Sequence, residues 1–352
     1  MNTSIMIGDT SIGSGFSVYI VAELSANHRQ QFDEAVKLLN VAKEAGADAV
    51  KLQTYTPDTL TIQCDAPEFR IGGGTLWDGK TLYELYSEAY MPWEWQPKLK
   101  EVAADIGIDL LSTPFDKTAV DFLETIGVPA YKVASFEIVD IPLIEYIAGK
   151  GKPIIISTGM ASMNEIEEAV QVARQAGASQ IALLKCTSAY PSLPEDMNLR
   201  TIPHLAEVFG IPVGFSDHTL GITVPVAAVA LGACIVEKHL TISRSIPSSD
   251  SAFSLEPQEF KSMVEAIRIA ERALGDLQYE ISEQETKSYA FRRSLFLVKD
   301  MKAGDAFSED NTRCIRPSHG MHPRHMKEVL GRRVVRDTQR GTPLSWELIS
   351  TD

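Results

Sequence analysis

The sequence has 352 residues, 47 of them acidic and 33 basic, so its formal net charge is −14. This charge argues against nonspecific binding to nucleic acid or to an anionic membrane surface, because both require an excess of basic residues. With 44% hydrophobic residues the chain can bury a sizeable core, which excludes an intrinsically disordered protein, and its length suggests two or three domains.

Short apolar runs alternate with longer amphipathic segments through most of the chain. Eight runs predict strands, at residues 18–22, 49–52, 108–112, 130–134, 153–158, 181–185, 212–215 and 233–238. Several are continuously apolar, which is typical of parallel strands buried on both faces. Between them, segments 32–45, 164–176 and 257–274 have apolar residues at helical spacing.

These repeats predict an α/β fold, a (β/α)8 TIM barrel of residues 1–278. A doubly wound open sheet is the alternative, but no phosphate-binding glycine motif follows the first strand. Residues 58–92 form an insertion after the second strand, a loop with a short helix near 82–90. A polar linker, 279–291, and a small, arginine-rich β domain, 292–352, complete the chain.

Four cysteines are far apart, and none belongs to a Cys-x-x-Cys pair: Cys64, Cys186, Cys234 and Cys314. They predict reduced thiols rather than a disulfide framework, and hence a cytoplasmic protein. The first basic residue is Arg29, so we expect no secretory signal peptide. The longest apolar run, 224–236, is too short to span a bilayer.

Polar residues gather where the predicted strands end, which is where the catalytic site of such a barrel lies. A single lysine in a buried strand is as often one member of a structural ion pair as it is a ligand-binding group. Lys51 and Lys132 together, near hydroxyl groups, instead predict a phosphate or carboxylate site. The surrounding polar residues are Gln53, Thr113, Ser135, Glu137, Ser157, Ser188, Tyr190 and Ser216.

Two histidines end the last two predicted strands, His218 and His239. A single histidine there is more often a hydrogen-bonded polar residue, but a pair on adjacent strands predicts a catalytic divalent cation. Glu23, at the end of the first strand, is either a third ligand or a general base. For Trp77, Trp93 and Trp95 the spacing favours a role in covering the barrel over one in lining a pocket.

At these residues the sequence resembles the sialic acid synthase family over almost the whole chain, including a C-terminal antifreeze-like (SAF) domain. The shared motifs are AELSANH (22–28), VKLQT (50–54), STPF (112–115), YKVAS (131–135), STGM (157–160), CTSAYP (186–191), FSDHT (215–219) and VEKH (236–239). Segments 23–28, 76–86, 92–95 and 250–257 are most similar to the pseudaminic acid synthases.

The resemblance implies condensation of phosphoenolpyruvate with an amino-sugar aldehyde, 2,4-diacetamido-2,4,6-trideoxy-L-altrose, with release of phosphate. It implies that Lys51, Thr113, Lys132, Ser135, Ser157 and Ser216 hold phosphoenolpyruvate, and that Ser188 replaces a family asparagine. His218 and His239 would bind Mn2+ or Mg2+, which polarises the aldehyde and positions or activates a water. Glu23 would handle protons, and Glu137 and Asp250 would contact the sugar. Arg316 would reach the sugar in the partner subunit of a domain-swapped homodimer.

Three other interpretations remain open. A neuraminate or legionaminate synthase would use the same chemistry on a different sugar. A non-catalytic glycan-binding protein would show no metal-dependent phosphate release. An aldolase would form a Schiff base on Lys132, which borohydride reduction with pyruvate would trap.

Overall fold

The computed structural model describes residues 4–351, and the chain divides into two compact units, one ending at Gly275 and the other beginning at Asp276. The first unit is a closed parallel barrel in which the last strand pairs with the first, so the open-sheet alternative is excluded. The strands are β3 (Tyr19–Glu23), β4 (Ala49–Thr54), β5 (Asp109–Pro114), β6 (Tyr131–Val133), β7 (Ile154–Ser157), β8 (Ile181–Cys186), β9 (Val213–Asp217) and β10 (Ile235–His239).

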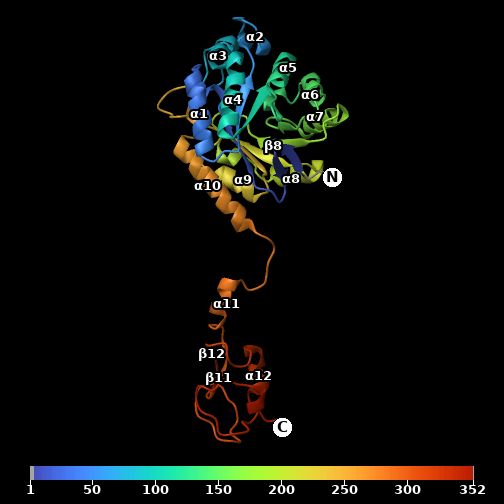
Figure 1. Cartoon of the computed structure of the whole chain (residues 1–352). Helices are drawn as coiled ribbons and strands as arrows, with labels where there is room; N and C mark the ends of the chain where they lie inside the picture. The colour runs from blue at the N-terminus through green and yellow to red at the C-terminus, as the bar shows by residue number, and fades with distance from the viewer. Residues whose placement is uncertain (1–3, 352) are drawn as a thin grey trace. The chain divides into compact units, whose positions relative to one another are not determined.

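One long helix follows each strand and packs on the outside of the barrel (Figure 1). These helices are α1 (Phe32–Glu44), α4 (Gln96–Ile106), α5 (Lys117–Ile126), α6 (Ile141–Ala148), α7 (Met163–Gln175), α8 (Thr201–Phe209), α9 (Thr223–Ala230) and α10 (Pro257–Leu274). Both the closed barrel and its helices agree with the predicted (β/α)8 fold.

Six of the eight barrel strands end later than the sequence predicted, whereas β6 and β7 end one residue earlier. Strands β3, β9 and β10 include the polar residues Glu23, Asp217 and His239, beyond the last apolar residue of each run. Backbone pairing does not depend on side-chain polarity, so the ladder continues past the point where hydrophobicity stops. Glu23 and His239 are therefore held on strands, whereas His218 directly follows β9.

Successive residues of each strand face alternately the interior of the barrel and the surrounding helices. In β4, Ala49 belongs to the interior cluster, whereas Val50 and Leu52 belong to the cluster shared with the helices. This two-residue period places Lys51 and Gln53 in the interior row, toward the carboxyl end of the strand. Polar side chains that face the helices must find partners there, as Lys238 does in a buried ion pair with Asp217 at 2.6 Å.

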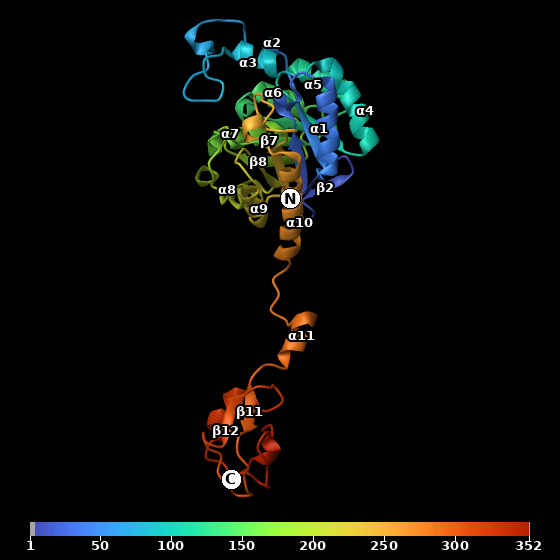
Figure 2. The ribbon, with the colours of Figure 1, turned by 90° about the vertical axis from the view of Figure 1, so that its left-hand side faces the viewer.

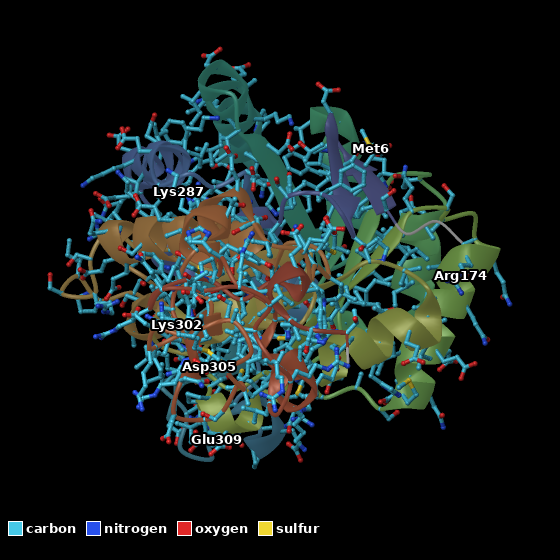
Figure 3. All side chains as sticks on the ribbon, turned by 90° about the horizontal axis from the view of Figure 1, so that it is seen from below. Met6, Arg174, Lys287, Lys302, Asp305 and Glu309 are labelled. Atoms are coloured by element: carbon cyan, nitrogen blue, oxygen red, sulfur yellow. The ribbon has the colours of Figure 1, made fainter. Side chains whose placement is uncertain are left out.

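An N-terminal hairpin closes the opposite end of the barrel. It consists of β1 (Ser4–Ile7) and β2 (Thr10–Gly13), which the sequence did not suggest. Its buried side chains Ile5, Ile7 and Ile12 join the interior cluster of the barrel. Met6 on this hairpin and Arg174 of α7 are labelled in Figure 3. With this end filled, ligands can reach the interior only from the carboxyl end.

The insertion after β4 carries α2 (Pro57–Leu60) and α3 (Leu82–Ala89), the second of which matches the predicted short helix. Thr81 caps α3 and Glu84 completes a capping box, which explains where the helix begins. In Figure 2 the insertion is the light-blue segment that extends beyond the ring of helices.

The second unit has its own small core, which includes Leu295, Phe307 and Val329. Its regular elements are α11 (Glu283–Tyr289), β11 (Ser294–Leu297), β12 (Thr312–Ile315) and α12 (Met326–Val329). Strands β11 and β12 pair antiparallel, and isolated bridges extend the pairing, for example between Met301 and Thr338. The predicted linker contains the helix α11, whose cap Ser282 accepts a hydrogen bond from the Glu285 N–H.

All four cysteines are free thiols. Within residues 4–351, the helices are too short or too polar to cross a membrane.

Candidate active site

The interior row of polar side chains meets at the carboxyl end of the barrel, and it includes most of the residues predicted from the sequence. Lys51 lies at its centre, with its Nζ 2.7 Å from Glu23 Oε2 and 3.7 Å from Glu237 Oε1. It also donates a hydrogen bond to Thr113 Oγ1 at 3.2 Å. Ser216 donates to Glu237 Oε1 at 3.1 Å. Five adjacent strands, β9, β10, β3, β4 and β5, thus contribute to one buried polar network around Lys51.

A second lysine, Lys132, lies two strands away from Lys51, on β6. Lys132 Nζ donates to Ser157 Oγ at 2.6 Å and to its neighbour's carbonyl, Val133 O, at 2.9 Å. Its side chain is almost completely buried. A buried ammonium group with only neutral partners favours an anionic ligand, since the ligand supplies the missing charge.

A small cradle of hydroxyl groups lies at Gly159, just after β7. The Gly159 N–H donates to Ser135 Oγ at 3.1 Å. A Cβ atom at this position would collide with the hydroxyl groups of Ser188 and Ser135, so only glycine permits their close approach. Ser188 Oγ is buried and has no hydrogen-bond partner among the described residues. An unpaired buried hydroxyl group indicates a place for a ligand oxygen.

Charge compensation differs between the two lysines. Burial would lower the pKa of Lys51, but the charges of Glu23 and Glu237 raise it. Burial lowers the pKa of Lys132, and Glu237 only partly opposes this. Of the two carboxyl groups, burial raises the pKa of Glu23, whereas Lys51 and Lys132 outweigh burial and lower that of Glu237. Glu23 is therefore the carboxyl group that more readily takes up a proton.

A chain of hydrogen bonds also connects Glu23 to Asp250, in the loop that follows the neighbouring strand β10. Gln53 Nε2 donates to Glu23 Oε1 and to Ser25 Oγ, at 3.0 Å in each case. Ser25 in turn donates to Asp250, which the Ala26 N–H also contacts at 3.4 Å. Gln53 and Asp250, predicted to bind substrate, therefore lie on one continuous polar wall.

The two histidines face each other, with ring centroids 5.3 Å apart. His218 Nδ1 donates to Thr187 O at 2.9 Å, so in the neutral form of this imidazole the lone pair is on Nε2. Burial keeps the pKa of His239 well below its usual range, so this imidazole is neutral. Its Nδ1 is buried without a partner among the described residues. Burial would lower the pKa of His218, but the Cys186 thiol and the Thr187 carbonyl raise it, so only His239 is held neutral. Two facing imidazoles whose nitrogens can release their protons are suited to a divalent cation.

No group of three or more histidine, cysteine or acidic side chains able to hold a metal is present within residues 4–351. The interpretation of Glu23 as a third ligand therefore lacks support, since its carboxyl group is engaged by Lys51 and Gln53. Any further ligands of a cation at the two histidines would be water or substrate.

The remaining predicted residues lie in different places. The Tyr190 ring is 4.3 Å from the His218 ring, at the edge of the histidine pair. Glu137 follows β6 and has one buried oxygen, Oε2, without a partner among the described residues. Arg316 is exposed on the second unit.

The shared motif at residues 236–239 contains Glu237, but it was not selected as a site residue from the sequence. The signal was available, because Glu237 lies two residues before His239 and therefore shares its face of β10. Ser25 was missed for a different reason. Its contact with Asp250 joins residues at opposite ends of the barrel sequence, and no local pattern indicates such a contact.

Comparisons with known proteins agree with this geometry. The sequence matches the NeuB family over residues 38–279 and the SAF domain over residues 292–350. Pseudaminic acid synthase of Campylobacter jejuni is 47% identical over 327 residues, 93% of this chain and 95% of that protein. N,N'-diacetyllegionaminic acid synthase of Legionella pneumophila is 37% identical over 343 residues, 96% of both chains. The crystal structure of N-acetylneuraminic acid synthetase from Leptospira borgpetersenii, in complex with citrate, has a TM-score of 0.73 and 32% identity, and covers 81% of this chain and 94% of that chain.

Glu137 makes stability depend on pH in a defined direction. Burial raises the pKa of this carboxyl group from 4.5 to about 7. Between these values the unfolded chain releases the proton that the folded chain keeps, so the free energy of unfolding falls as pH rises. The predicted loss is on the order of 3 kcal/mol and is complete above about pH 7. Glu137→Gln should remove this pH-dependent decrease in the free energy of unfolding.

The measurement is urea unfolding of the wild type and of Glu137→Gln at about pH 5 and pH 8. Glu145→Gln, at an exposed position of α6, serves as the matched control and should behave as the wild type. An identical pH dependence in the wild type and Glu137→Gln would contradict the assignment.

Proposed function

The chain belongs to the NeuB family, and on this premise we propose that it is a pseudaminic acid synthase, a transferase that forms a C–C bond. It would condense phosphoenolpyruvate with 2,4-diacetamido-2,4,6-trideoxy-L-altrose and water, giving pseudaminic acid and phosphate. The observation that carries this proposal is the pair of buried lysines, Lys51 and Lys132, in the same barrel interior as two facing histidines. An anion site and a cation site thus share the interior of one barrel.

Phosphoenolpyruvate would lie between the two lysines. Lys132, Ser157, Ser135 and Ser188 present donors around the Gly159 cradle, whose size and polarity suit a phosphoryl group. Lys51, Thr113 and Ser216 would then hold the carboxylate end. The unpaired Ser188 hydroxyl group would take the place of the asparagine amide found in neuraminate synthases.

Mn2+ or Mg2+ fits the histidine pair, because His239 has an unpaired buried nitrogen and His218 has its tautomer fixed by Thr187. When bound, the cation would supply Lewis-acid polarisation of the sugar aldehyde. The protein would position the reactants by holding phosphoenolpyruvate on one side and the sugar on the wall formed by Gln53 and Asp250.

The bond-forming step joins carbon 3 of phosphoenolpyruvate to the aldehyde carbon. Water then adds to carbon 2, and the C–O bond to phosphate breaks as the 2-keto group forms. Of the two hydrogens of water, one ends on the new hydroxyl group and one on phosphate. Glu23 is placed to move these protons, since it lies beside His239 in the strand register and its pKa is raised by burial.

The sugar would contact Glu137, Tyr190 and Asp250, which surround the opening of the interior. Glu137 with its raised pKa can donate or accept a hydrogen bond near neutral pH. The same geometry would serve a neuraminate or legionaminate synthase, but sequence identity favours the pseudaminic acid synthases, at 47% against 37% and 32% for the other two proteins. A glycan-binding protein without activity would have no use for a cation site beside an anion site.

One observation favours the aldolase as a second candidate. Burial lowers the pKa of Lys132, which is the condition under which a lysine forms a Schiff base. However, its hydrogen bond to Ser157 occupies the amine, and the hydroxyl cradle suits a phosphate that such an aldolase would not require.

We also propose that the protein is a cytoplasmic homodimer in which the second unit of one copy completes the site of the other. The segment that follows the barrel exposes apolar side chains, with Leu277 97% and Tyr279 98% exposed and Phe291 also largely exposed. A second copy would cover such side chains at a substantial gain in hydrophobic free energy. Arg316 of the partner would then reach the sugar.

The function is tested by measuring phosphate release from phosphoenolpyruvate with a panel of amino sugars. We expect turnover with the trideoxy-altrose sugar and little with N-acetylmannosamine. Turnover of N-acetylmannosamine alone would contradict the assigned sugar. Borohydride trapping of pyruvate on Lys132, without phosphate release, would support the aldolase instead.

His218→Ala should abolish turnover and metal dependence while the barrel stays folded. Losing one imidazole removes several kcal/mol of charge stabilisation, equivalent to a decrease in kcat of at least about 100-fold. Binding of Mn2+, followed by electron paramagnetic resonance, should weaken in parallel. His204→Ala, at an exposed position of α8, is the matched control. Unchanged Mn2+ affinity in His218→Ala would remove this residue from the cation site.

Arg316→Ala should raise the KM for the sugar about ten-fold or more, because a charge-assisted hydrogen bond is lost, with the KM for phosphoenolpyruvate unchanged. The dimer mass, measured by light scattering, should also be unchanged. Arg313→Ala, at an exposed position of β12, is the control. An unaltered sugar KM in Arg316→Ala would exclude the role given to the second unit.

A further inference from the structure

The insertion after β4 contains a well-defined hairpin, residues 70–81, that carries Trp77. Arg70 and Thr81 form an antiparallel bridge, and the Ile71 N–H donates to Lys80 O at 2.8 Å. At the tip, Asp78 accepts hydrogen bonds from the N–H groups of Gly74 and Thr75, at 2.8 Å in each case. These bonds restrict the tip, so Trp77 has a defined position.

Trp77 extends the aromatic wall that begins at the histidine pair. Its ring centroid is 5.8 Å from that of Tyr190, and Tyr190 is 4.3 Å from His218. Trp77 Nε1 donates to Ser249 O at 3.0 Å, which attaches the hairpin to the loop after β10. That loop contains Asp250. The hairpin therefore reaches from the insertion to the edge of the proposed sugar site.

A cavity of about 680 Å³ lies at this junction, lined by Ala26, Gln30, Leu76, Trp77, Ser248 and Ser249 among others. It is adjacent to Asp250, because the backbone of Ala26 contacts that carboxylate at 3.4 Å. A ligand held by Asp250 can thus extend directly into the cavity. Its volume suits a small molecule rather than a single water.

The charges around the cavity are already compensated. Arg29 pairs with Glu34 at 3.1 Å, Lys80 pairs with Glu88, and Arg244 forms a two-pronged pair with Glu259. The cavity is therefore not a free anion site. Its apolar wall of Trp77, Leu76 and Ala26 instead favours a neutral group with methyl or C–H surface.

We propose that Trp77 and this cavity select the acceptor sugar by packing against the methyl groups of its acetamido substituents and its deoxygenated carbon 6. This inference rests on the proposed function and names the specificity-determining residue of the same site. N-acetylmannosamine carries a hydroxymethyl group at carbon 6 and lacks the second acetamido group, so it would leave the apolar wall uncovered. When two substrates differ by one methylene group that lies in an apolar pocket, their kcat/KM values differ by about 10–200-fold.

The test is steady-state phosphate release by the wild type, Trp77→Ala and Trp77→Phe with the trideoxy-altrose sugar and with N-acetylmannosamine. We expect Trp77→Ala to raise the KM of the preferred sugar about ten-fold or more and to reduce the preference between sugars by a similar factor. The KM for phosphoenolpyruvate should not change. Trp77→Phe should keep most of the preference, because an aromatic ring remains.

Ile62→Ala, an exposed position of the same insertion, is the matched control and should behave as the wild type. An unchanged sugar KM and preference in Trp77→Ala would overturn the proposal. So would an equal rise in KM for both sugars, because it would show that Trp77 only supports the neighbouring loop.

A fluorescence titration separates this proposal from the proposed function. Sugar binding should change the tryptophan fluorescence of the wild type but not of Trp77→Phe. A Trp77-dependent change without phosphate release would refute the synthase activity and leave the sugar contact standing. Phosphate release with no Trp77-dependent change, and with unaltered kinetics in Trp77→Ala, would refute the sugar contact alone.

Discussion

The alternation of side chains along closed parallel strands is the constraint on which the site depends. Every second residue of a barrel strand faces the interior, so a polar residue at such a position is buried and must be compensated by another interior residue. The N-terminal hairpin fills one end with Ile5, Ile7 and Ile12, and apolar interior residues fill the middle. Charged side chains therefore collect at the carboxyl end, where a ligand can compensate them.

The two buried lysines differ in the charges of their partners, and this difference favours an anionic ligand. Lys51 has two carboxylate partners, Glu23 and Glu237, whereas Lys132 has only neutral ones. An anion would add the charge that Lys132 lacks, and the Gly159 cradle would add donors for its oxygens. The two histidines lie at the carboxyl ends of the neighbouring strands β9 and β10, so a cation would bind beside the anion without competing for its donors.

Much of this site could be predicted from the sequence. Lys51 and Lys132 interrupt apolar runs, and His218 and His239 come after two others. A barrel brings the carboxyl ends of its strands together whatever the sequences of its loops. Residues on loops were harder to place. The sequence does not distinguish the roles of three tryptophans, Trp77, Trp93 and Trp95. In the structure Trp93 stacks on Phe122 of α5. Trp77 instead contacts Tyr190 and lines the cavity beside Asp250.

The sequence by itself determined the alternation of strands and helices and the identity of the residues near the strand ends, because hydrophobic periodicity is a local property of the chain. That the sheet closes into a barrel was decided by the pairing of β10 with β3. Only the tertiary structure decided which partner each buried group has. The pairing of Lys51 with Glu237, the bond from Ser25 to Asp250 and the reach of Trp77 to Ser249 join segments far apart in the chain. Such contacts depend on where backbones meet in space, and no local pattern of residues encodes that.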